Sequence, residues 1–295
     1  MKRSTDCMEF DSKIKDTIYL LEEFRKAIIE SDIVLDEMIS GLHKSRVGGN
    51  NIEFLDYRDY VYGDDLKYVD WKVLLRSNKY FIKRFDDTKR NQVYIFLDTT
   101  DSMSEKNRFL RAVLLIVAIS NIFIRMKDDV YLIMNDEKIA VGEFSGNAII
   151  PVMTDIFLNR RFNKGDFIYR YERLLDIVPG NSILCLFSDL FSKPEVVIEN
   201  IRNISATGIF QYIFHIINDN ELNPDLKGLK MFIDPDSENK LLIQSDNIWE
   251  DYKNILNDYI KEIDDILTTS AKGRYLLCPE NLSLRDTLIR FFEKR

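Results

Sequence analysis

Apolar and polar residues follow two different rhythms along this chain. From residue 92 onward, short continuous apolar runs, of which 93–97 and 183–187 are the clearest, alternate with longer stretches where apolar residues recur every three or four positions. A short apolar run bounded by polar residues is typical of a buried strand, and the longer spacing is typical of a helix that buries one face. This region therefore predicts strands that alternate with helices.

Alternating strands and helices favour a mostly parallel sheet with helices on both faces. The predicted strands 130–134 and 139–144 are joined by the short polar turn 135–138. That link is too short for a crossover connection, so the two strands must be antiparallel. We therefore predict a doubly wound α/β fold whose mostly parallel sheet has one antiparallel edge strand. Further strands are expected at 210–217 and 275–277, and helices at 108–126, 148–159, 167–177, 195–204, 248–267 and 282–292.

Residues 1–90 form the predicted N-terminal part, and their pattern is less regular. Apolar residues at helical spacing predict a helix over 14–29. A second, short helix is expected over 32–39, with Ser31 as its N-cap. The N-terminal part therefore begins with helices.

The segment 41–90 holds Gly48-Gly49, several tyrosines and many paired charges, and it shows no clear periodicity. We expect a compact irregular segment with a short helix near Trp71 and a strand over 80–85. The predicted α/β domain then occupies residues 91–295.

The composition limits the function. The 295 residues are 45% hydrophobic and 31% charged, which is ordinary for a globular protein. The formal net charge of −8 disfavours a nucleic-acid binder, because contacts to phosphates call for net positive charge. The three cysteines lie far apart in no metal-type spacing, so the sequence predicts neither a disulfide framework nor a zinc site.

No targeting or membrane segment is predicted. The first ten residues lack the apolar core of a signal peptide. The longest apolar stretch, 112–124, is shorter than the roughly 20 residues that span a bilayer, and it is better explained as a buried helix. We therefore expect a cytoplasmic protein without a direct membrane span.

Hydroxyl and carboxylate side chains follow two of the predicted strands. One strand leads into Asp98, Thr100 and Ser102. Another leads into Ser188 and Asp189. If these strands are neighbours where the winding of the sheet reverses, the side chains converge on one site. They offer only hard oxygen ligands, which suit Mg²⁺ or Mn²⁺, and such a site could leave one position open for a partner's carboxylate.

Polar residues at a strand-to-helix turn have a second explanation. Ser102 with Glu105 fits a capping box, and Asp98 and Asp101 would favour a helix N-terminus. Asp189, in the matching position of the other strand, favours the metal interpretation over helix caps alone.

The loop Asp98-Thr99-Thr100-Asp101-Ser102 resembles the D-x-S-x-S motif of the metal-ion-dependent adhesion site in von Willebrand factor A domains, with Thr100 in place of the middle Ser. Ser188-Asp189 resembles the third motif loop of that site. The second loop usually provides a Thr, but the matching stretch 163–167 has no hydroxyl, and Asp166 is the alternative oxygen donor. The resemblance implies a von Willebrand factor A-like fold and a metal that is bound weakly, bound differently or not bound at all.

Before the sheet domain lie the motifs Gly41-Leu42-His43-Lys44-Ser45, Asp56-Tyr57-Arg58-Asp59-Tyr60 and Asp70-Trp71-Lys72. They resemble the signature of the bacterial "domain of unknown function 58" family, and the resemblance covers roughly 35–295. It implies a partner of MoxR-type AAA+ ATPases and of other von Willebrand factor A-type proteins, in chaperone-like assembly or metal insertion. The charged residues among the motifs form either a docking surface or an internal network of salt bridges and turns. The signature residues are His43, Glu53, Arg58, Asp64, Asp65, Asp70 and Trp71.

Three functions stay open. The first is a non-enzymatic protein-interaction module with a metal-assisted site, and the second is a scaffold whose metal site is degenerate. The third is a metal-dependent phosphohydrolase, against which Thr100 counts, because an Asp nucleophile at 98 would need an acidic residue there. The sequence has neither a phosphate-binding P-loop nor a nucleophile elbow. His215, in a predicted central strand, is interpreted as a core residue.

Overall fold

The computed structural model describes most of the chain and divides it into two compact units. One unit contains Met1–Met38 and Asn91–Arg295, and the other contains Ile39–Arg90. Residues 1–38 of the predicted N-terminal part are thus grouped with the sheet domain. The described residues are 2–44, 54–59, 81–85, 90–134, 137–140, 149–159, 162, 167–224, 229–233, 240–244 and 248–293.

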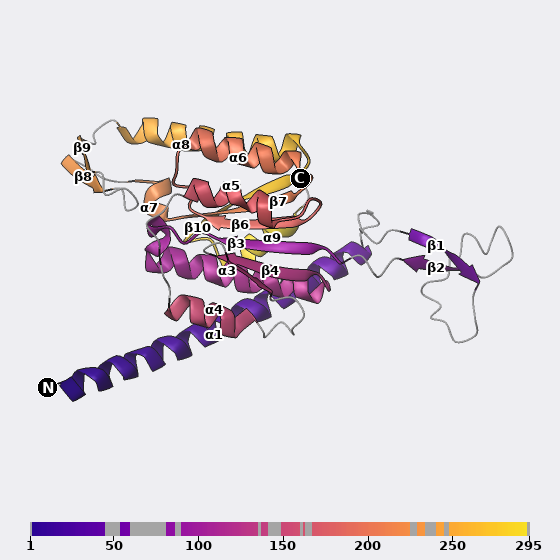
Figure 1. The fold of residues 1–295 in the computed structure, drawn as a ribbon, viewed down its shortest axis with the longest axis horizontal. Helices are drawn as coiled ribbons and strands as arrows, with labels where there is room; N and C mark the ends of the chain where they lie inside the picture. Colours follow the sequence, from indigo (N-terminus) through magenta and orange to yellow (C-terminus); the bar gives the residue numbers. More distant parts are fainter. Residues whose placement is uncertain are drawn as a thin grey trace. The chain divides into compact units, whose positions relative to one another are not determined.

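A six-stranded sheet forms the centre of the first unit (Figure 1). Its strands run in the order β10-β7-β6-β3-β4-β5, and only β5 is antiparallel to its neighbour. The predicted doubly wound fold, mostly parallel with one antiparallel edge strand, is therefore confirmed. The strands are β3 (Gln92–Leu97), β4 (Asp129–Met134), β5 (Glu137–Ala140), β6 (Ile183–Ser188), β7 (Phe210–Ile217) and β10 (Gly273–Pro279).

The winding direction reverses between β3 and β6. From β3 the chain proceeds outward through β4 and β5, and from β6 it proceeds outward on the other side through β7 and β10. Residues 93–97 of β3 are all buried, because helices cover both faces of the sheet. The carboxyl ends of β3 and β6 therefore meet at the position where ligands bind in folds of this class.

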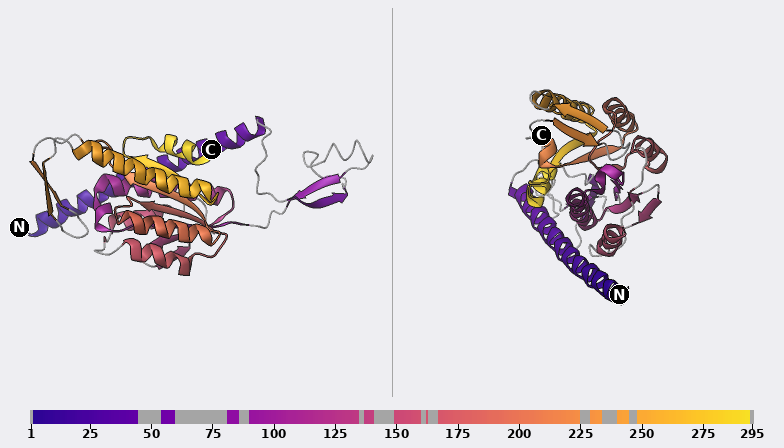
Figure 2. Two further views of the ribbon diagram at one scale, coloured as in Figure 1. Left: turned by 90° about the horizontal axis from the view of Figure 1, so that it is seen from above. Right: turned by 90° about the vertical axis from the view of Figure 1, so that its left-hand side faces the viewer.

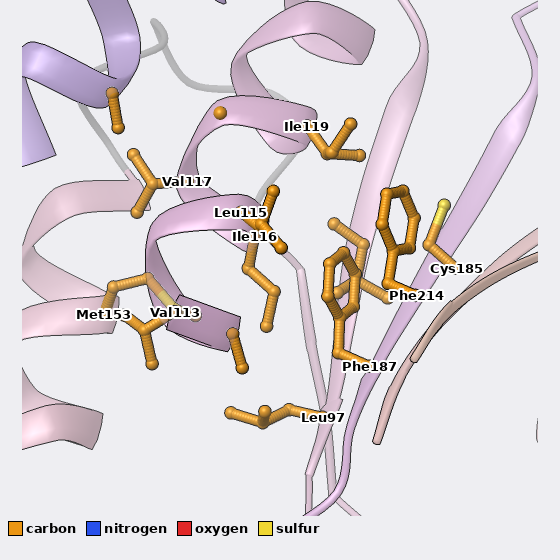
Figure 3. Packing of buried hydrophobic residues seen from close by; sticks show 14 of the residues in the cluster. Leu97, Val113, Leu115, Ile116, Val117, Ile119, Met153, Cys185, Phe187 and Phe214 are labelled. Carbon is orange, nitrogen blue, oxygen red and sulfur yellow. The ribbon is translucent and has the colours of Figure 1, made fainter. Parts of the chain in front are cut away.

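Helices cover the sheet in two layers (Figures 1 and 2). Alternate residues of the strands enter different cores: Ile95 belongs to the core that includes residues of α1, α3, α4 and α9, whereas Tyr94 belongs to the core that includes residues of α5, α6 and α8. Figure 3 shows Phe187 and Phe214 on the face turned toward α3, and their rings stack with centroids 4.4 Å apart. The helices are α1 (Lys2–Lys44), α3 (Lys106–Arg125), α4 (Ile149–Leu158), α5 (Phe167–Ile177), α6 (Pro194–Ala206), α8 (Ile248–Thr269) and α9 (Leu284–Phe292).

Helix α3 is the central element of the first core. Within the described part of the chain, it is the one helix long and apolar enough to cross a membrane. However, 78% of its apolar window is buried inside the protein, as the core helix of a soluble domain would be. The buried position of α3 thus accounts for its hydrophobicity and agrees with the interpretation of 112–124 as a buried helix.

Helix α1 corrects the prediction of two N-terminal helices, because it continues through residue 31. Ser31 is buried in mid-helix, where its Oγ donates to the carbonyl oxygen of Ile28 (2.8 Å) and accepts from Nδ2 of Asn121 in α3 (2.9 Å). A serine can satisfy its hydroxyl on the preceding helical turn. Ser31 therefore serves a contact between helices and is not an N-cap.

Several short elements were not predicted. In the second unit, β1 (Phe54–Asp59) pairs antiparallel with β2 (Phe81–Phe85), of which only β2 was expected. In the first unit, β8 (Leu229–Ile233) and β9 (Lys240–Gln244) form another antiparallel pair. The 3₁₀ helix η2 (Asp101–Ser104) and the short helix α7 (Asp219–Leu222) complete the described elements.

Candidate functional site

The residues at the carboxyl ends of β3 and β6 meet as predicted. The two strands are parallel neighbours, and the amide of Asp98 donates to the carbonyl oxygen of Phe187 (2.9 Å), which extends their pairing. We call the buried polar residues that meet here the strand-end cluster. Its members are Asp98, Thr100, Ser102, Ser188 and Asp189, all of which are buried.

Asp98 links the two loops. Its Oδ1 accepts hydrogen bonds from both the amide and the hydroxyl of Thr100, each at 2.9 Å, and its Oδ2 accepts from Oγ of Ser188 at 2.6 Å. The hydroxyls of Thr100 and Ser102 lie 3.0 Å apart. Burial, followed by the negative charge of Asp189, raises the pKa of Asp98 to about 7, although these hydrogen bonds oppose the shift.

Asp189 is paired with a cation that the sequence did not single out. Arg108, near the start of α3, is itself buried and forms a salt bridge with Oδ2 of Asp189 through Nη1. The same nitrogen donates to the carbonyl oxygen of Ser102 (2.9 Å). Burial raises the pKa of Asp189, and the charge of Arg108 opposes that shift. Arg108 thus neutralises the buried carboxylate and joins it to the loop after β3.

The other arm of the guanidinium reaches a third segment. Nη2 of Arg108 forms a salt bridge with Oε1 of Glu221 in α7, which follows β7. Oε2 of Glu221 accepts a hydrogen bond from the amide of Asn218 (2.9 Å), as part of the capping box of this short helix. The Glu221 carboxylate is therefore oriented by its own helix before it meets Arg108.

An exposed aromatic ring lies next to this pair. The guanidinium carbon of Arg108 lies 5.4 Å from the ring centroid of Phe191, whose exposed fraction is 41%. The preceding residue, Leu190, is buried and has a φ of 54°, which is a costly backbone conformation for a residue with a branched side chain. This turn directs Phe191 outward at the edge of the cluster.

The helix-capping alternative is not what the structure shows. Glu105 caps α3 itself, because its side chain accepts from the amides of Asn107 (3.2 Å) and Arg108 (2.8 Å). Ser102 lies in η2 and its hydroxyl contacts Thr100 instead. Capping of α3 therefore does not explain the polar side chains at the strand ends.

The cluster, as described, does not fit a divalent metal ion. Both oxygens of Asp98 already accept hydrogen bonds from protein groups, and Asp189 is paired with a guanidinium. The described residues contain no group of three or more His, Cys, Asp or Glu side chains that could hold a metal ion. Thr154, in the helix before the stretch 163–167, donates to the carbonyl oxygen of Ile150 within α4 (2.7 Å). The predicted Mg²⁺ or Mn²⁺ thus stays a prediction without support from this geometry, and Asp166 lies outside the described residues.

The sequence analysis missed Arg108 and Glu221. The one local signal was a charged residue at the start of an almost wholly apolar helix, and that signal is also compatible with a solvent-exposed position. Glu221 lies 113 residues further along the chain, so only the folded sheet brings the two together.

Two of the signature residues lie in described elements of the structure. His43 lies in α1 and Arg58 lies in β1, where it is paired with Ile82 of β2. His215 is buried in β7, and its Nδ1 lies 2.5 Å from the hydroxyl of Tyr275, as expected of a core residue. Burial lowers the pKa of His215 to about 4. The signature residues outside the described structure are Glu53, Asp64, Asp65, Asp70 and Trp71.

The solved structures that are similar to the chain include two Bacteroides proteins and one VWA domain. The conserved hypothetical protein BatB from Bacteroides thetaiotaomicron is 12% identical with a TM-score of 0.41, and the match covers 68% of this chain and 96% of that chain. An aerotolerance-related membrane protein from Bacteroides fragilis NCTC 9343, with multiple mutations to serines, is 14% identical with a TM-score of 0.37, covering 67% and 94%. The SpRpn10 VWA domain is 10% identical with a TM-score of 0.37, covering 69% and 95%. No curated protein matches the chain.

A family model covers most of the chain. The model described as "Protein of unknown function DUF58" matches residues 56–259. The match includes most of β1, all of β2, the strand-end cluster and the sheet strands from β3 through β7, so it covers parts of both units. The chain therefore belongs to the DUF58 family, as its spaced motifs predict.

Proposed function

We propose that this protein is a non-enzymatic, cytoplasmic protein-interaction module that works with a MoxR-type AAA+ ATPase in chaperone-like assembly. Its partners bind at the carboxyl ends of the strands, where the strand-end cluster lies. Membership of the DUF58 family supports the choice of partner, because the motifs of this family led to the same expectation. The polar side chains of the cluster are hydrogen-bonded to one another, and this arrangement supports a binding role.

The exposed Phe191 next to Arg108 is the observation on which this proposal rests. Aromatic and arginine side chains are the residue types that most often anchor protein interfaces. Phe191 is presented by the left-handed turn at Leu190, and its ring is held over a guanidinium that two carboxylates fix in place. A rigid, half-exposed ring of this kind loses little conformational entropy when a partner covers it.

The same geometry argues against a phosphohydrolase. A nucleophilic aspartate needs an oxygen that can reach the substrate, and both oxygens of Asp98 are engaged with Thr100 and Ser188 in a buried position. The scaffold alternative, an interaction module without divalent dependence, is favoured by the Arg108 salt bridge.

The proposal is tested with the MoxR-type ATPase of the same organism. Binding is measured by biolayer interferometry for the wild type, Phe191→Ser and Leu175→Ser. Leu175 in α5 is the matched control, since its exposed fraction of 40% is close to that of Phe191. We expect Phe191→Ser to weaken binding by about tenfold or more, and Leu175→Ser to leave it unchanged. No measurable binding of the wild type would refute the proposed partner.

Catalysis is tested separately. Hydrolysis of p-nitrophenyl phosphate and of ATP is followed with Mg²⁺ and with Mn²⁺, for the wild type and for Asp98→Asn. We expect both proteins to match the rate without protein. A wild-type rate that Asp98→Asn abolishes would instead support the phosphohydrolase.

A further inference from the structure

The position of Arg108 is not explained by local helix preferences. The N-terminus of a helix carries partial positive charge, so a cation in its first turn is unfavourable. Arg108 is the third residue of α3, and its side chain has an exposed fraction of only 5%. A buried charge in an unfavourable place is retained only where specific partners hold it. Its partners are the two carboxylates of Asp189 and Glu221.

We propose that the guanidinium of Arg108 takes the place of a divalent cation at the strand-end cluster, so that this chain's site is completed by a cation of its own.

The contacts of Arg108 are those that a bound ion would otherwise make. It joins three segments that follow three adjacent strands: the carbonyl of Ser102 after β3, Asp189 after β6 and Glu221 after β7. A metal ion joins such loops through oxygen ligands at one point. The planar guanidinium joins them through separate N–H donors with fixed directions. The loops are thereby held together without an exchangeable ligand.

Charge opposes a second cation in the same place. The guanidinium already neutralises one of the carboxylates that a divalent ion would need, and it would repel an ion bound within a few ångströms. Without the Arg108 charge, the cluster would present only hard oxygen donors. These are the carboxylates of Asp189 and Glu221 and the carbonyl oxygen of Ser102, which the guanidinium now contacts. That donor set is the chemistry that Mn²⁺ and Mg²⁺ prefer.

The test is a Mn²⁺ titration by calorimetry on the full chain and two variants. Arg108→Gln removes the charge and leaves a shorter polar side chain, and Arg108→Lys keeps the charge as the matched control. We expect no saturable binding to the wild type or to Arg108→Lys, and saturable binding to Arg108→Gln that is at least about tenfold tighter than any wild-type signal. The double variant Arg108→Gln/Asp189→Asn should lose that binding.

Two results would overturn the inference. One is saturable Mn²⁺ binding to the wild type that Arg108→Gln does not strengthen, and the other is a folded Arg108→Gln variant that binds no Mn²⁺. If Arg108→Gln does not fold alone, it is refolded with and without Mn²⁺, and recovery only with Mn²⁺ supports the inference, whereas no recovery with Mn²⁺ counts against it. The wild-type melting temperature should also be the same in EDTA and in Mg²⁺, and a decrease in EDTA would contradict an internal cation.

This inference does not depend on the identity of the partner. Mn²⁺ binding is measured on the isolated chain, whereas the proposed function is measured as ATPase binding by Phe191 variants. A negative result in one experiment therefore does not contradict the proposal that the other experiment tests.

Discussion

The two ends of helix α3 both bury a polar side chain against another segment, but with different chemistry. At its start, the buried Arg108 carries a full charge and is held by two carboxylates. Near its end, the buried Asn121 is neutral and donates to Ser31 (2.9 Å) and Asp32 (2.7 Å) of α1. Both arrangements satisfy a polar group inside an apolar helix, yet only the first desolvates a charge.

The charged residue near the end of α3 stays in contact with water. Arg125 lies in the last turn, where a cation is favourable for the helix dipole, and it forms exposed salt bridges with Asp32 (3.1 Å) and Asp36 (3.0 Å). This end follows the local rules for a stable helix, whereas Arg108 violates them. The difference indicates that packing against α1 determines the polar residues at the end of α3, whereas the strand-end cluster determines the residue at its start.

The largest effect is expected at Arg108. Arg108→Gln leaves the buried Asp189 without its cation, and breaking a buried ion pair in this way costs about 3–5 kcal/mol of the free energy of unfolding. The measurement is urea denaturation followed by circular dichroism. Arg108→Lys serves as the control, and we expect it to recover part of the loss because it retains the charge without the fork-shaped donor set. Equal stability of wild type and Arg108→Gln would show that the pair is not a structural element.

Asp98 should make stability depend on pH in an unusual direction. Its folded pKa of about 7 lies above the unfolded value of about 3.9, so between these values the folded protein binds more protons than the unfolded chain. The stabilisation that protonation of Asp98 gives the folded protein is therefore complete below about pH 4, and it is lost as the pH rises through 7. Relative to Asp98→Asn, which cannot titrate, the wild type should gain about 2.5 kcal/mol between pH 8 and pH 5.

The difference between the two proteins isolates this effect. His215, whose pKa is lowered to about 4, acts in the opposite direction over part of that range. Its contribution is common to the wild type and to Asp98→Asn. A difference in unfolding free energy that stays constant from pH 5 to pH 8 would contradict the raised pKa.

These residues also show where sequence reasoning succeeds. The strand order and the meeting of Asp98 with Asp189 could be predicted, because apolar periodicity and the reversal of winding fix which strand ends are neighbours. The antiparallel position of β5 followed from the short link to β4. These features depend on patterns that many residues share.

The content of the site depends on single side chains and could not be predicted. Both a metal ion and a guanidinium satisfy buried carboxylates, and the sequence around Asp189 does not distinguish them. The salt bridge between Arg108 and Glu221 joins positions 113 residues apart through a four-residue helix that has no periodicity of its own. Ser31 was assigned to a cap because caps and mid-helix contacts use the same residue type.

A smaller effect is expected at Asn121. Asn121→Leu removes the donor to Ser31 and Asp32 and leaves the buried Ser31 hydroxyl with only its bond to Ile28. We expect a loss of about 1–2 kcal/mol, because the buried group that loses its partner, the Ser31 hydroxyl, is neutral, and Asp32 stays solvent-exposed and paired with Arg125. Chemical denaturation provides the measurement. A loss as large as that of Arg108→Gln would contradict the distinction between a buried charge and a buried amide.

The smallest effect belongs to the exposed pairs of Arg125. Arg125→Ala removes the salt bridges to Asp32 and Asp36, whose side chains have exposed fractions of 41% and 63%. Solvent screening limits such pairs to less than about 1 kcal/mol, and added salt weakens them further. We expect the wild type and Arg125→Ala to differ by a few degrees or less in melting temperature at low salt, and to converge at 1 M NaCl. The corresponding difference for Arg108→Gln should persist at 1 M NaCl, since the ion pair of Arg108 with Asp189 is shielded from the solvent ions.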